Sequence, residues 1–331
     1  MFQSLRDFGT EDSLSFSFGG RTRAFYALDI PSENIPQFQQ SVGAFPPIPE
    51  LSAIRERPTD MSKGGKGAGK GQFEFPTGIA VDSTGNVLVG DSGNGRIEKF
   101  SPTGAFLSNI GTKGTGPGQL RDPNGLAVDR TGNIYVADTS NGRVQKMAPD
   151  GTFVAEWKGP EPGFYGPRRI AIGPDDSIYV VDQGHNRIVK FGSNGEVLVT
   201  WGRKGNGDGE FNDPTSVAVD PGTNKVYVAD PNNKRIQVFD NNGKFLTKWS
   251  MPEWGSGASF EDLAIDSQTS RLYATSTQLD TVLVFDLKGT RIGSLTPKPP
   301  DKLEGPSALA LTDRKLYVLN MGGNRVSAID L

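Results

Sequence analysis

The residues of this chain that could act together at one place are two adjacent arginines, two adjacent carboxylates, an asparagine and the only histidine. They are Arg168, Arg169, Glu261, Asp262, Asn124 and His185. Guanidinium groups bind a carboxylate or phosphate through paired hydrogen bonds. Carboxylate and amide oxygens bind calcium, and a histidine can act as a general acid or base. Whether these side chains meet depends on the elements that hold them.

Those elements belong to a repeat. An alanine in an apolar run marks each copy, and successive alanines are 47, 44, 47, 46 and 46 residues apart. The marking residues are Ala80, Ala127, Ala171, Ala218, Ala264 and Ala310. Each copy contains short runs rich in Val, Ile, Tyr and Phe, separated by Gly, Asn and Asp, which predicts strands and tight turns. Three runs recur in every copy, and the first five add a fourth, such as Phe106–Ile110. Small sheets repeated at this spacing predict an all-β, six-bladed β-propeller.

The best-preserved copies share a motif. A Pro precedes an apolar strand that ends in Asp, a Gly-Asn turn follows, and a second strand ends in Asp before Asn-x-Arg. Copies one, two and four carry Asp91, Asn94 and Arg96, then Asp138, Asn141 and Arg143, then Asp230, Asn233 and Arg235. Copy three has His185 in place of the Asn, and copy six has Asn320 in place of the Asp but keeps Arg325. Copy five has lost the motif. From about Leu51 to Leu331 the chain resembles the NHL-repeat family of six-bladed propellers.

The repeat also predicts the domain organisation. Residues 1–48 lie outside it and form an N-terminal arm, with a hairpin predicted around Gly19-Gly20 and a Pro-rich segment after it. Residues 49–331 form the propeller. Copy six stops after its third strand, so we expect Leu51–Arg57 to pair with Arg325–Ile329 and complete the last blade. This pairing would remove the open edges of a broken ring.

Loop lengths distinguish two faces of the predicted disc. Turns between the first and second strands and between the third and fourth are tight, and strand alternation places them all on one face. The long links between blades lie on the other face, where binding sites on rigid scaffolds usually lie. There, the two residues after each blade's Pro position should surround the mouth of the central channel. These pairs are Thr77-Gly78, Asn124-Gly125, Arg168-Arg169, Thr215-Ser216, Glu261-Asp262 and Ser307-Ala308.

Two interpretations of the charged mouth residues remain open. The arginines and carboxylates either pair across the channel or bind a polar ligand. Glu261, Asp262 and Asn124 could hold calcium, as in calcium-dependent lactonases on such propellers, although the arginines oppose a cation. His185 either replaces the motif's Asn or carries protons, as histidine does in virginiamycin-type lyases. One histidine cannot make a three-histidine zinc site, and we expect neither a metal nor another cofactor.

The repeated Asp and Arg residues have a structural interpretation. Because the sets recur from blade to blade, we expect the Asp to close its loop and the Arg to bond loop carbonyls or the next blade. The segment Gly64–Gly71 nearly matches a phosphate-binding loop, but Gly71 replaces the required Ser or Thr and no helix follows. It recurs as a blade linker. The linkers' lysines, including Lys66, Lys113 and Lys204, could attract RNA, but few aromatic residues accompany them.

Bulk properties limit the function classes. The net charge is −3 and the pI about 5.4, which argues against a general nucleic-acid binder. There are no cysteines and no apolar run of membrane-spanning length. The resemblance implies an extracytoplasmic protein, whereas a native start at Met1, without a signal peptide, would imply the cytoplasm. We expect a non-catalytic module that binds another protein. The alternatives are a hydrolase or lyase at the channel mouth and, less favoured, RNA binding by the loop face.

Overall fold

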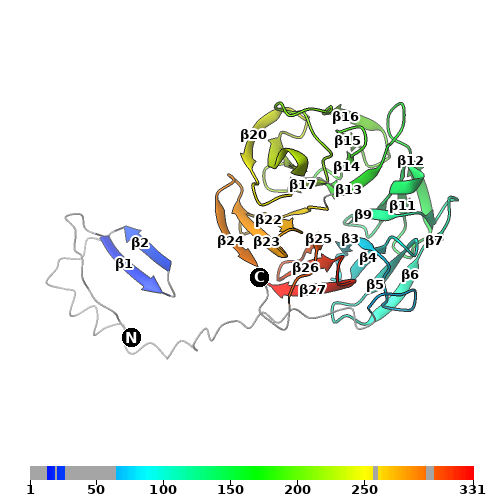
Figure 1. Ribbon diagram of the computed structural model, residues 1–331, viewed down its shortest axis with the longest axis horizontal. Coiled ribbons are helices and arrows are strands. Elements are labelled where there is room, and N and C mark those ends of the chain that lie inside the picture. Colours follow the sequence, from blue (N-terminus) through cyan, green and yellow to red (C-terminus); the bar gives the residue numbers. More distant parts are fainter. Residues whose placement is uncertain (1–12, 19–20, 27–64, 256–259, 296–301) are drawn as a thin grey trace. The chain divides into compact units, whose positions relative to one another are not determined.

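The computed structural model describes residues 13–18, 21–26, 65–255, 260–295 and 302–331 (Figure 1). The chain divides into two units, Met1–Arg55 and Glu56–Leu331. In the first unit, β1 (Ser13–Phe18) and β2 (Arg21–Tyr26) pair antiparallel, with Phe18 opposite Arg21. The remainder of the predicted arm and the predicted closing strand Leu51–Arg57 lie outside the described residues.

The second unit is a ring of six antiparallel sheets around a central axis, which confirms the predicted all-β, six-bladed propeller (Figure 1). Blade 1 contains β3 (Pro76–Val81), β4 (Val87–Asp91), β5 (Arg96–Phe100) and β6 (Phe106–Ile110); blade 2 contains β9 (Pro123–Val128), β10 (Ile134–Asp138), β11 (Arg143–Met147) and β12 (Phe153–Trp157). Blade 3 contains β13 (Pro167–Ile172), β14 (Ile178–Asp182), β15 (Arg187–Phe191) and β16 (Val197–Trp201); blade 4 contains β17 (Ser216–Asp220), β18 (Lys225–Asp230), β19 (Arg235–Phe239) and β20 (Phe245–Ser250). Blade 5 contains β21 (Leu263–Asp266), β22 (Arg271–Ser276), β23 (Thr281–Asp286) and β24 (Arg291–Leu295); blade 6 contains β25 (Pro306–Leu311), β26 (Lys315–Asn320) and β27 (Arg325–Asp330).

Each blade buries both faces of its sheet against its neighbours. The middle of each second strand is therefore largely apolar, and in blades two to six a tyrosine stands at the same place in it, almost fully buried. These residues are Tyr135, Tyr179, Tyr227, Tyr273 and Tyr317, and Leu88 occupies the place in blade 1. Six apolar clusters lie between adjacent blades. Burial of this size is the dominant force that assembles the blades.

The ring closes by direct contact between its first and last blades. One cluster joins Ile79 and Val89 of blade 1 to Ala308, Leu319 and Val326 of blade 6. The inner strands β25 and β3 also lie next to each other. Among the described residues blade 6 has three strands, as the sequence predicts for the copy that ends early.

The two faces of the ring differ as expected. Tight turns close one face, and the link before blade 2 is long enough to contain a parallel pair, β7 (Thr112–Lys113) and β8 (Gln119–Leu120). The links before blades 1 and 4 make the equivalent single bridges, Lys66 with Phe73 and Lys204 with Phe211. Two short 3-10 helices, η2 (Thr139–Asn141) and η3 (Pro231–Asn233), follow the second strands of blades 2 and 4. No helix in the described part of the chain is long and apolar enough to cross a membrane.

Candidate functional site

The predicted mouth residues lie where the inner strands begin, at one end of the central axis. Thr77, Asn124, Arg168, Arg169 and Ser307 belong to β3, β9, β13 and β25, while Thr215 and the Glu261-Asp262 pair directly precede β17 and β21. Arg169, Glu261, Asp262 and Asn124 are all buried. The repeat alone is enough to bring these residues together.

Arg169 crosses the axis. Its guanidinium donates from Nη1 to the Asn124 carbonyl of blade 2 at 2.6 Å and from Nη2 to the Ser307 carbonyl of blade 6 at 2.6 Å. Blade 6 lies opposite blade 3 in a ring of six, so a side chain from blade 3 reaches it only through the centre. Arg169 Nε lies 3.1 Å from Asp262 Oδ1 of blade 5, close enough for an ion pair but without an aligned hydrogen bond. One guanidinium thus ties blades 2, 3, 5 and 6 together.

Asp262 completes this arrangement from the other side. Its Oδ1 accepts a hydrogen bond from Ser216 Oγ of blade 4 at 2.6 Å, and its Oδ2 accepts one from the Leu309 N–H of blade 6 at 2.8 Å. A buried carboxylate is stable only when it is paired and hydrogen-bonded. Of the two interpretations of the mouth charges, pairing across the channel therefore describes Arg169 and Asp262.

Arg168 makes different contacts from Arg169. Its Nε donates to Gln183 Oε1 at 2.7 Å, and its guanidinium stacks 4.8 Å from the centre of the Phe260 ring. No carboxylate of the described residues lies within ion-pair distance of it. Burial lowers the pKa of the Arg168 guanidinium to about 10, and the neighbouring charge of Arg169 adds to this decrease. Arg168 therefore remains a cation at neutral pH.

Glu261 is a buried carboxyl with neutral partners. It accepts hydrogen bonds from the Thr277 hydroxyl at 2.9 Å and the Thr275 hydroxyl at 3.3 Å. Burial raises the pKa of the Glu261 carboxyl to about 7, opposed by the hydrogen bonds from the two threonines. The group is therefore divided between its neutral and charged forms near pH 7, as a general acid or base requires.

Asn124 contributes its backbone to the Arg169 contact, but its side-chain Oδ1 is buried without a hydrogen-bond partner in the described part of the molecule. The next residue, Gly125, lies so close to blade 3 that a Cβ atom there would stand 1.9 Å from the Arg168 carbonyl oxygen. Only glycine permits this approach of the two inner strands. Among the described residues no three or more His, Cys, Asp or Glu side chains group closely enough to hold a metal ion. A calcium site built from Glu261, Asp262 and the amide of Asn124 remains a prediction.

His185 lies in the loop after β14, and its contacts are with Asp182 and Tyr165. Its Nδ1 is 3.0 Å from Asp182 Oδ2, and its ring lies 5.8 Å from that of Tyr165. In blades 1, 2 and 4 the motif's Asn makes the same contact with its Asp, at 2.7, 2.8 and 2.9 Å. His185 therefore occupies the place of the motif's Asn.

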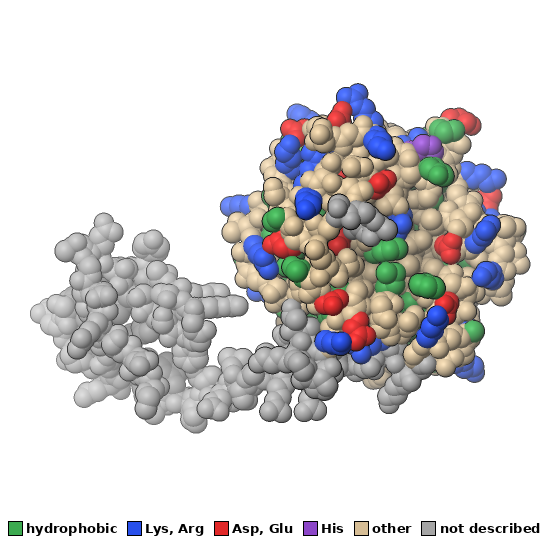
Figure 2. Space-filling view, viewed as in Figure 1, with side chains coloured by type: hydrophobic (Ala, Val, Ile, Leu, Met, Phe, Trp, Pro, Cys, Tyr) green, Lys and Arg blue, Asp and Glu red, His purple; other side chains and the backbone are tan. Residues whose placement is uncertain are grey.

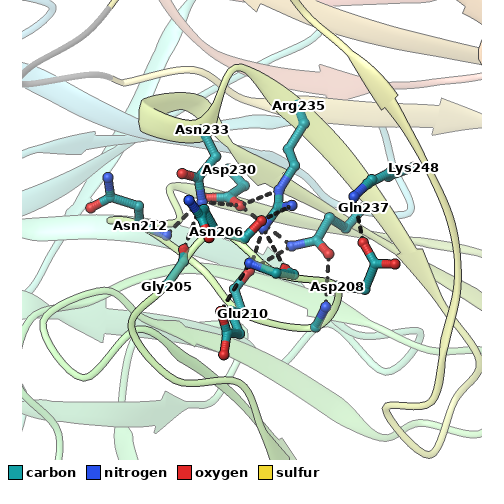
Figure 3. Close-up of polar contacts among 12 residues, drawn as sticks. Gly205, Asn206, Asp208, Glu210, Asn212, Asp230, Asn233, Arg235, Gln237 and Lys248 are labelled. Carbon is teal, nitrogen blue, oxygen red and sulfur yellow. Dashed lines mark hydrogen bonds and ion pairs between the residues drawn. The ribbon is translucent and has the colours of Figure 1, made fainter.

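The repeated Asp, Asn and Arg side chains organise the linkers, as the sequence indicates. In blade 4, Arg235 donates from Nε to Asp230 Oδ2 at 2.7 Å and from Nη2 to the carbonyls of Gly207 and Glu210 at 2.9 and 2.7 Å (Figure 3). Asn233 Nδ2 donates to the Gly205 carbonyl at 2.9 Å. Blades 1 and 2 repeat this pattern through Arg96 and Arg143. The linkers before blades 1, 2 and 4 are therefore fixed by the same set of hydrogen bonds.

A further member of this network was missed at the sequence level. Gln145 and Gln237 each accept a hydrogen bond from a linker N–H, at 2.9 and 3.0 Å, and donate to a linker carbonyl. Glu98 takes this place in blade 1, where it accepts a hydrogen bond from the Gly71 N–H at 2.8 Å and forms an ion pair with Arg96 at 2.6 Å. A Glu or Gln two positions after the motif Arg of blades 1, 2 and 4 is the signal that could have identified it.

These features define a six-bladed propeller whose linker loops are organised by a repeated Asp-Asn-Arg set. The family model of the NHL repeat matches residues 73–100, 120–147, 164–191 and 211–239, which cover the first three strands of each of the first four blades. The chain is an NHL-repeat β-propeller.

Solved structures with this fold include enzymes. The chain is 16% identical to a streptogramin B lyase, with a TM-score of 0.56 over 76% of this chain and 78% of that chain. It is 14% identical to a catalytically inactive virginiamycin B lyase from Staphylococcus aureus with quinupristin, with a TM-score of 0.57 over 80% and 82%. It is 15% identical to a gluconolactonase from Xanthomonas campestris, with a TM-score of 0.62 over 78% and 87%. Identities this low show a shared fold. No curated protein matches the sequence significantly.

Proposed function

We propose that this propeller is a non-catalytic module that binds another protein through its linker face. We define the linker face as the end of the ring that carries the links between blades and the loops between second and third strands. The observation that carries the proposal is a pair of exposed aromatic side chains on this face, Phe75 and Tyr165, which are 62% and 68% exposed. Aromatic residues of this kind supply most of the binding energy in many protein interfaces.

Both aromatic residues are held in place. Phe75 directly precedes the Pro that starts blade 1 and has φ +49°, a left-handed backbone that Asp122 and Asp213 adopt at the same place in other blades. A bulky residue seldom adopts this conformation, and the rigid linker fixes it there. Lys66 lies 5.7 Å from the Phe75 ring centre, and Tyr165 contacts His185. Pre-ordered aromatic residues bind at a low cost in entropy.

The charged mouth residues support the same proposal. Arg169 and Asp262 are engaged with each other and with the backbone of other blades, so these two charges are already neutralised within the propeller. Figure 2 shows basic and acidic side chains interspersed on one face of the propeller, without a field of one sign that would favour nucleic acid.

Affinity capture from an extract of the source organism, with the full chain as bait, tests this function. We expect one partner to be retained by the wild type and lost in a Phe75→Ser/Tyr165→Ser variant. Leu246→Ser is the matched control, because Leu246 is exposed on the outer strand β20 of the rim, away from the linker face. Equal recovery of the partner by all three baits would contradict the proposal.

A second candidate function is supported by Glu261. We propose as the alternative a hydrolase or lyase at the channel mouth, because this carboxyl has a pKa of about 7 and lies at the same end of the axis as the unpartnered Asn124 Oδ1. The fold is shared with a streptogramin B lyase and a gluconolactonase. Metal analysis together with lactone, ester and streptogramin substrates separates the two. Metal-dependent turnover that disappears in Glu261→Ala or His185→Ala would replace the binding proposal with the catalytic one.

A further inference from the structure

The linker before blade 4 differs from the linkers before blades 1 and 2 at a surface site next to the Asn233–Gly205 hydrogen bond. A surface cavity of about 340 Å³ opens there, lined by Lys204, Gly205, Asn206, Asn212 and Asn233. Lys204 is the only charged residue in this lining. The cavity lies beside the rigid network of Figure 3, in which the side chain of Asn212 points away from Arg235.

The same positions in blade 1 explain what the blade-4 cavity lacks. The linkers align residue for residue, so that Lys204 corresponds to Lys66, Asn206 to Ala68 and Asn212 to Glu74. In blade 1, Lys66 Nζ pairs with Glu74 Oε1 at 3.2 Å. Blade 4 keeps the lysine but has a neutral amide in place of that glutamate.

In blade 2 the corresponding lysine is also engaged. Lys113 Nζ donates to the Gly93 carbonyl at 3.1 Å, and Arg121 stands where blade 1 has its glutamate. Lys204, in contrast, makes no hydrogen bond or ion pair within the described ranges of the chain. The side chains of Asn206 and Asn212 likewise have no hydrogen bond among the residues the structure describes, so each can donate its amide N–H groups.

We infer that the blade-4 cavity binds a carboxylate group, namely an acidic side chain of the protein partner. Lys204 supplies the positive charge, and the amides of Asn206 and Asn212 supply neutral donors. The bound carboxylate takes the place that Glu74 fills in blade 1. Hydrogen bonds between a charged acceptor and such donors are stronger than neutral ones. The partner's identity as a protein rests on the proposed function, whereas the carboxylate chemistry rests on this cavity.

The cavity is prepared for a ligand before the ligand arrives. Gly205 and Asn206 are fixed by hydrogen bonds from Asn233 and Arg235 to their carbonyls at 2.9 and 2.8 Å. Asn212 is fixed by its own N–H, which donates to Asp230 at 2.8 Å. Two neighbouring ion pairs, Arg203 with Glu210 and Lys248 with Asp208, engage other charges of this linker, and Lys204 is the cation in the lining of the cavity.

Titration followed by ¹H–¹⁵N NMR of the full chain tests the inference. The probes are glutarate, a short capped peptide with two glutamates, and the same peptide with two glutamines. We expect glutarate and the glutamate peptide to shift the side-chain amide signals of Asn206 and Asn212. The glutamine peptide should leave them unchanged. The shifts should weaken as salt is added, because the contact is an exposed ion pair.

Asn212→Glu is the decisive variant, since it gives blade 4 the carboxylate that blade 1 already has. The new carboxylate should pair with Lys204, preserve the melting temperature and lower the affinity for glutarate at least about tenfold. Asn242→Glu, which adds the same charge to an exposed tight turn, is the matched control and should bind as the wild type does. Glu74→Gln should create a new glutarate site at Lys66.

Equal shifts with the glutamine peptide, or unchanged affinity in Asn212→Glu, would overturn the inference. If glutarate binds but the glutamate peptide does not, the cavity binds a free carboxylate. The inference that the carboxylate belongs to a protein side chain would then be wrong. The outcome is independent of the capture experiment. If a partner is captured through Phe75 and Tyr165 but the amide signals of Asn206 and Asn212 do not shift, only the carboxylate site is rejected. A carboxylate site without any captured partner rejects only the proposed function.

Discussion

Replacing Arg169 with Met should destabilise the whole ring. The side chain is buried, and it joins blade 3 to carbonyls of blades 2 and 6 and to Asp262 of blade 5. Its loss leaves Asp262 as a buried charge with two neutral donors. Removing one partner of a buried ion pair costs about 3–5 kcal/mol. For a domain of this size 1 kcal/mol shifts the melting temperature by about 2–4 °C, so we expect a decrease of about 10 °C.

Arg168→Met is the matched control, because it removes the adjacent guanidinium from the same strand. Arg168 contributes one hydrogen bond to Gln183 and one stacking contact with Phe260. These contacts are worth about 1–2 kcal/mol together. Thermal unfolding followed by circular dichroism should therefore separate the two variants clearly.

A double mutant isolates the ion pair. Combining Arg169→Met with Asp262→Asn removes both charges and keeps one acceptor oxygen for the Leu309 N–H, while the new amide NH2 faces the Ser216 hydroxyl oxygen. We expect the double variant to be more stable than the sum of the single changes predicts, by about 1–3 kcal/mol. Equal melting temperatures for Arg169→Met and Arg168→Met, or strictly additive effects, would show that the axis is not held by this pair.

Three further predictions follow from the blades, the linkers and the buried carboxyl. Gly125→Ala places a Cβ 1.9 Å from the Arg168 carbonyl and should cost at least about 3 kcal/mol in denaturant unfolding, whereas Gly293→Ala, with no atom within 4 Å, should be tolerated. Arg235→Ala should speed hydrogen exchange at the Gly205 N–H by at least about tenfold. Arg203→Ala removes only an exposed ion pair with Glu210 and should lower the free energy of unfolding by less than about 1 kcal/mol. The raised pKa of Glu261 means that the folded state holds its proton more tightly, so the stability attributable to this group should fall as pH rises from about 4.5 to about 7. Glu261→Gln should flatten that dependence and stabilise the protein by about 1–3 kcal/mol at pH 8 in urea titrations, and an unchanged pH profile would disprove the assignment.

The sequence predicts the blades well because their determinants are local and repeated. Runs such as Ile134–Asp138 alternate with turn residues at a fixed period, and the period alone gives the blade number. The same reasoning places the mouth pairs at one end of the axis. It also predicts the structural role of Arg96, Arg143 and Arg235, because a set that recurs in several blades is part of the scaffold.

The contacts across the axis could not be predicted in the same way. Arg168 and Arg169 are adjacent and chemically equal in the sequence, yet one spans the ring and the other stacks on Phe260. The difference depends on strand alternation and on which opposite carbonyls are within reach. At Lys204, the sequence shows Asn212 where blade 1 has Glu74, but the Lys66–Glu74 ion pair and the cavity beside Lys204 required the structure. The predicted closing strand Leu51–Arg57 remains a prediction.

Cross-linking mass spectrometry of the captured complex tests the central claim most directly, because exposed lysines mark both faces of the ring. Lys66, Lys113 and Lys204 lie on the linker face, whereas Lys244 and Lys288 lie in tight turns on the opposite face. We predict that the partner cross-links to the first group and protects it from acetylation. Cross-links confined to Lys244 and Lys288 would contradict binding through the linker face.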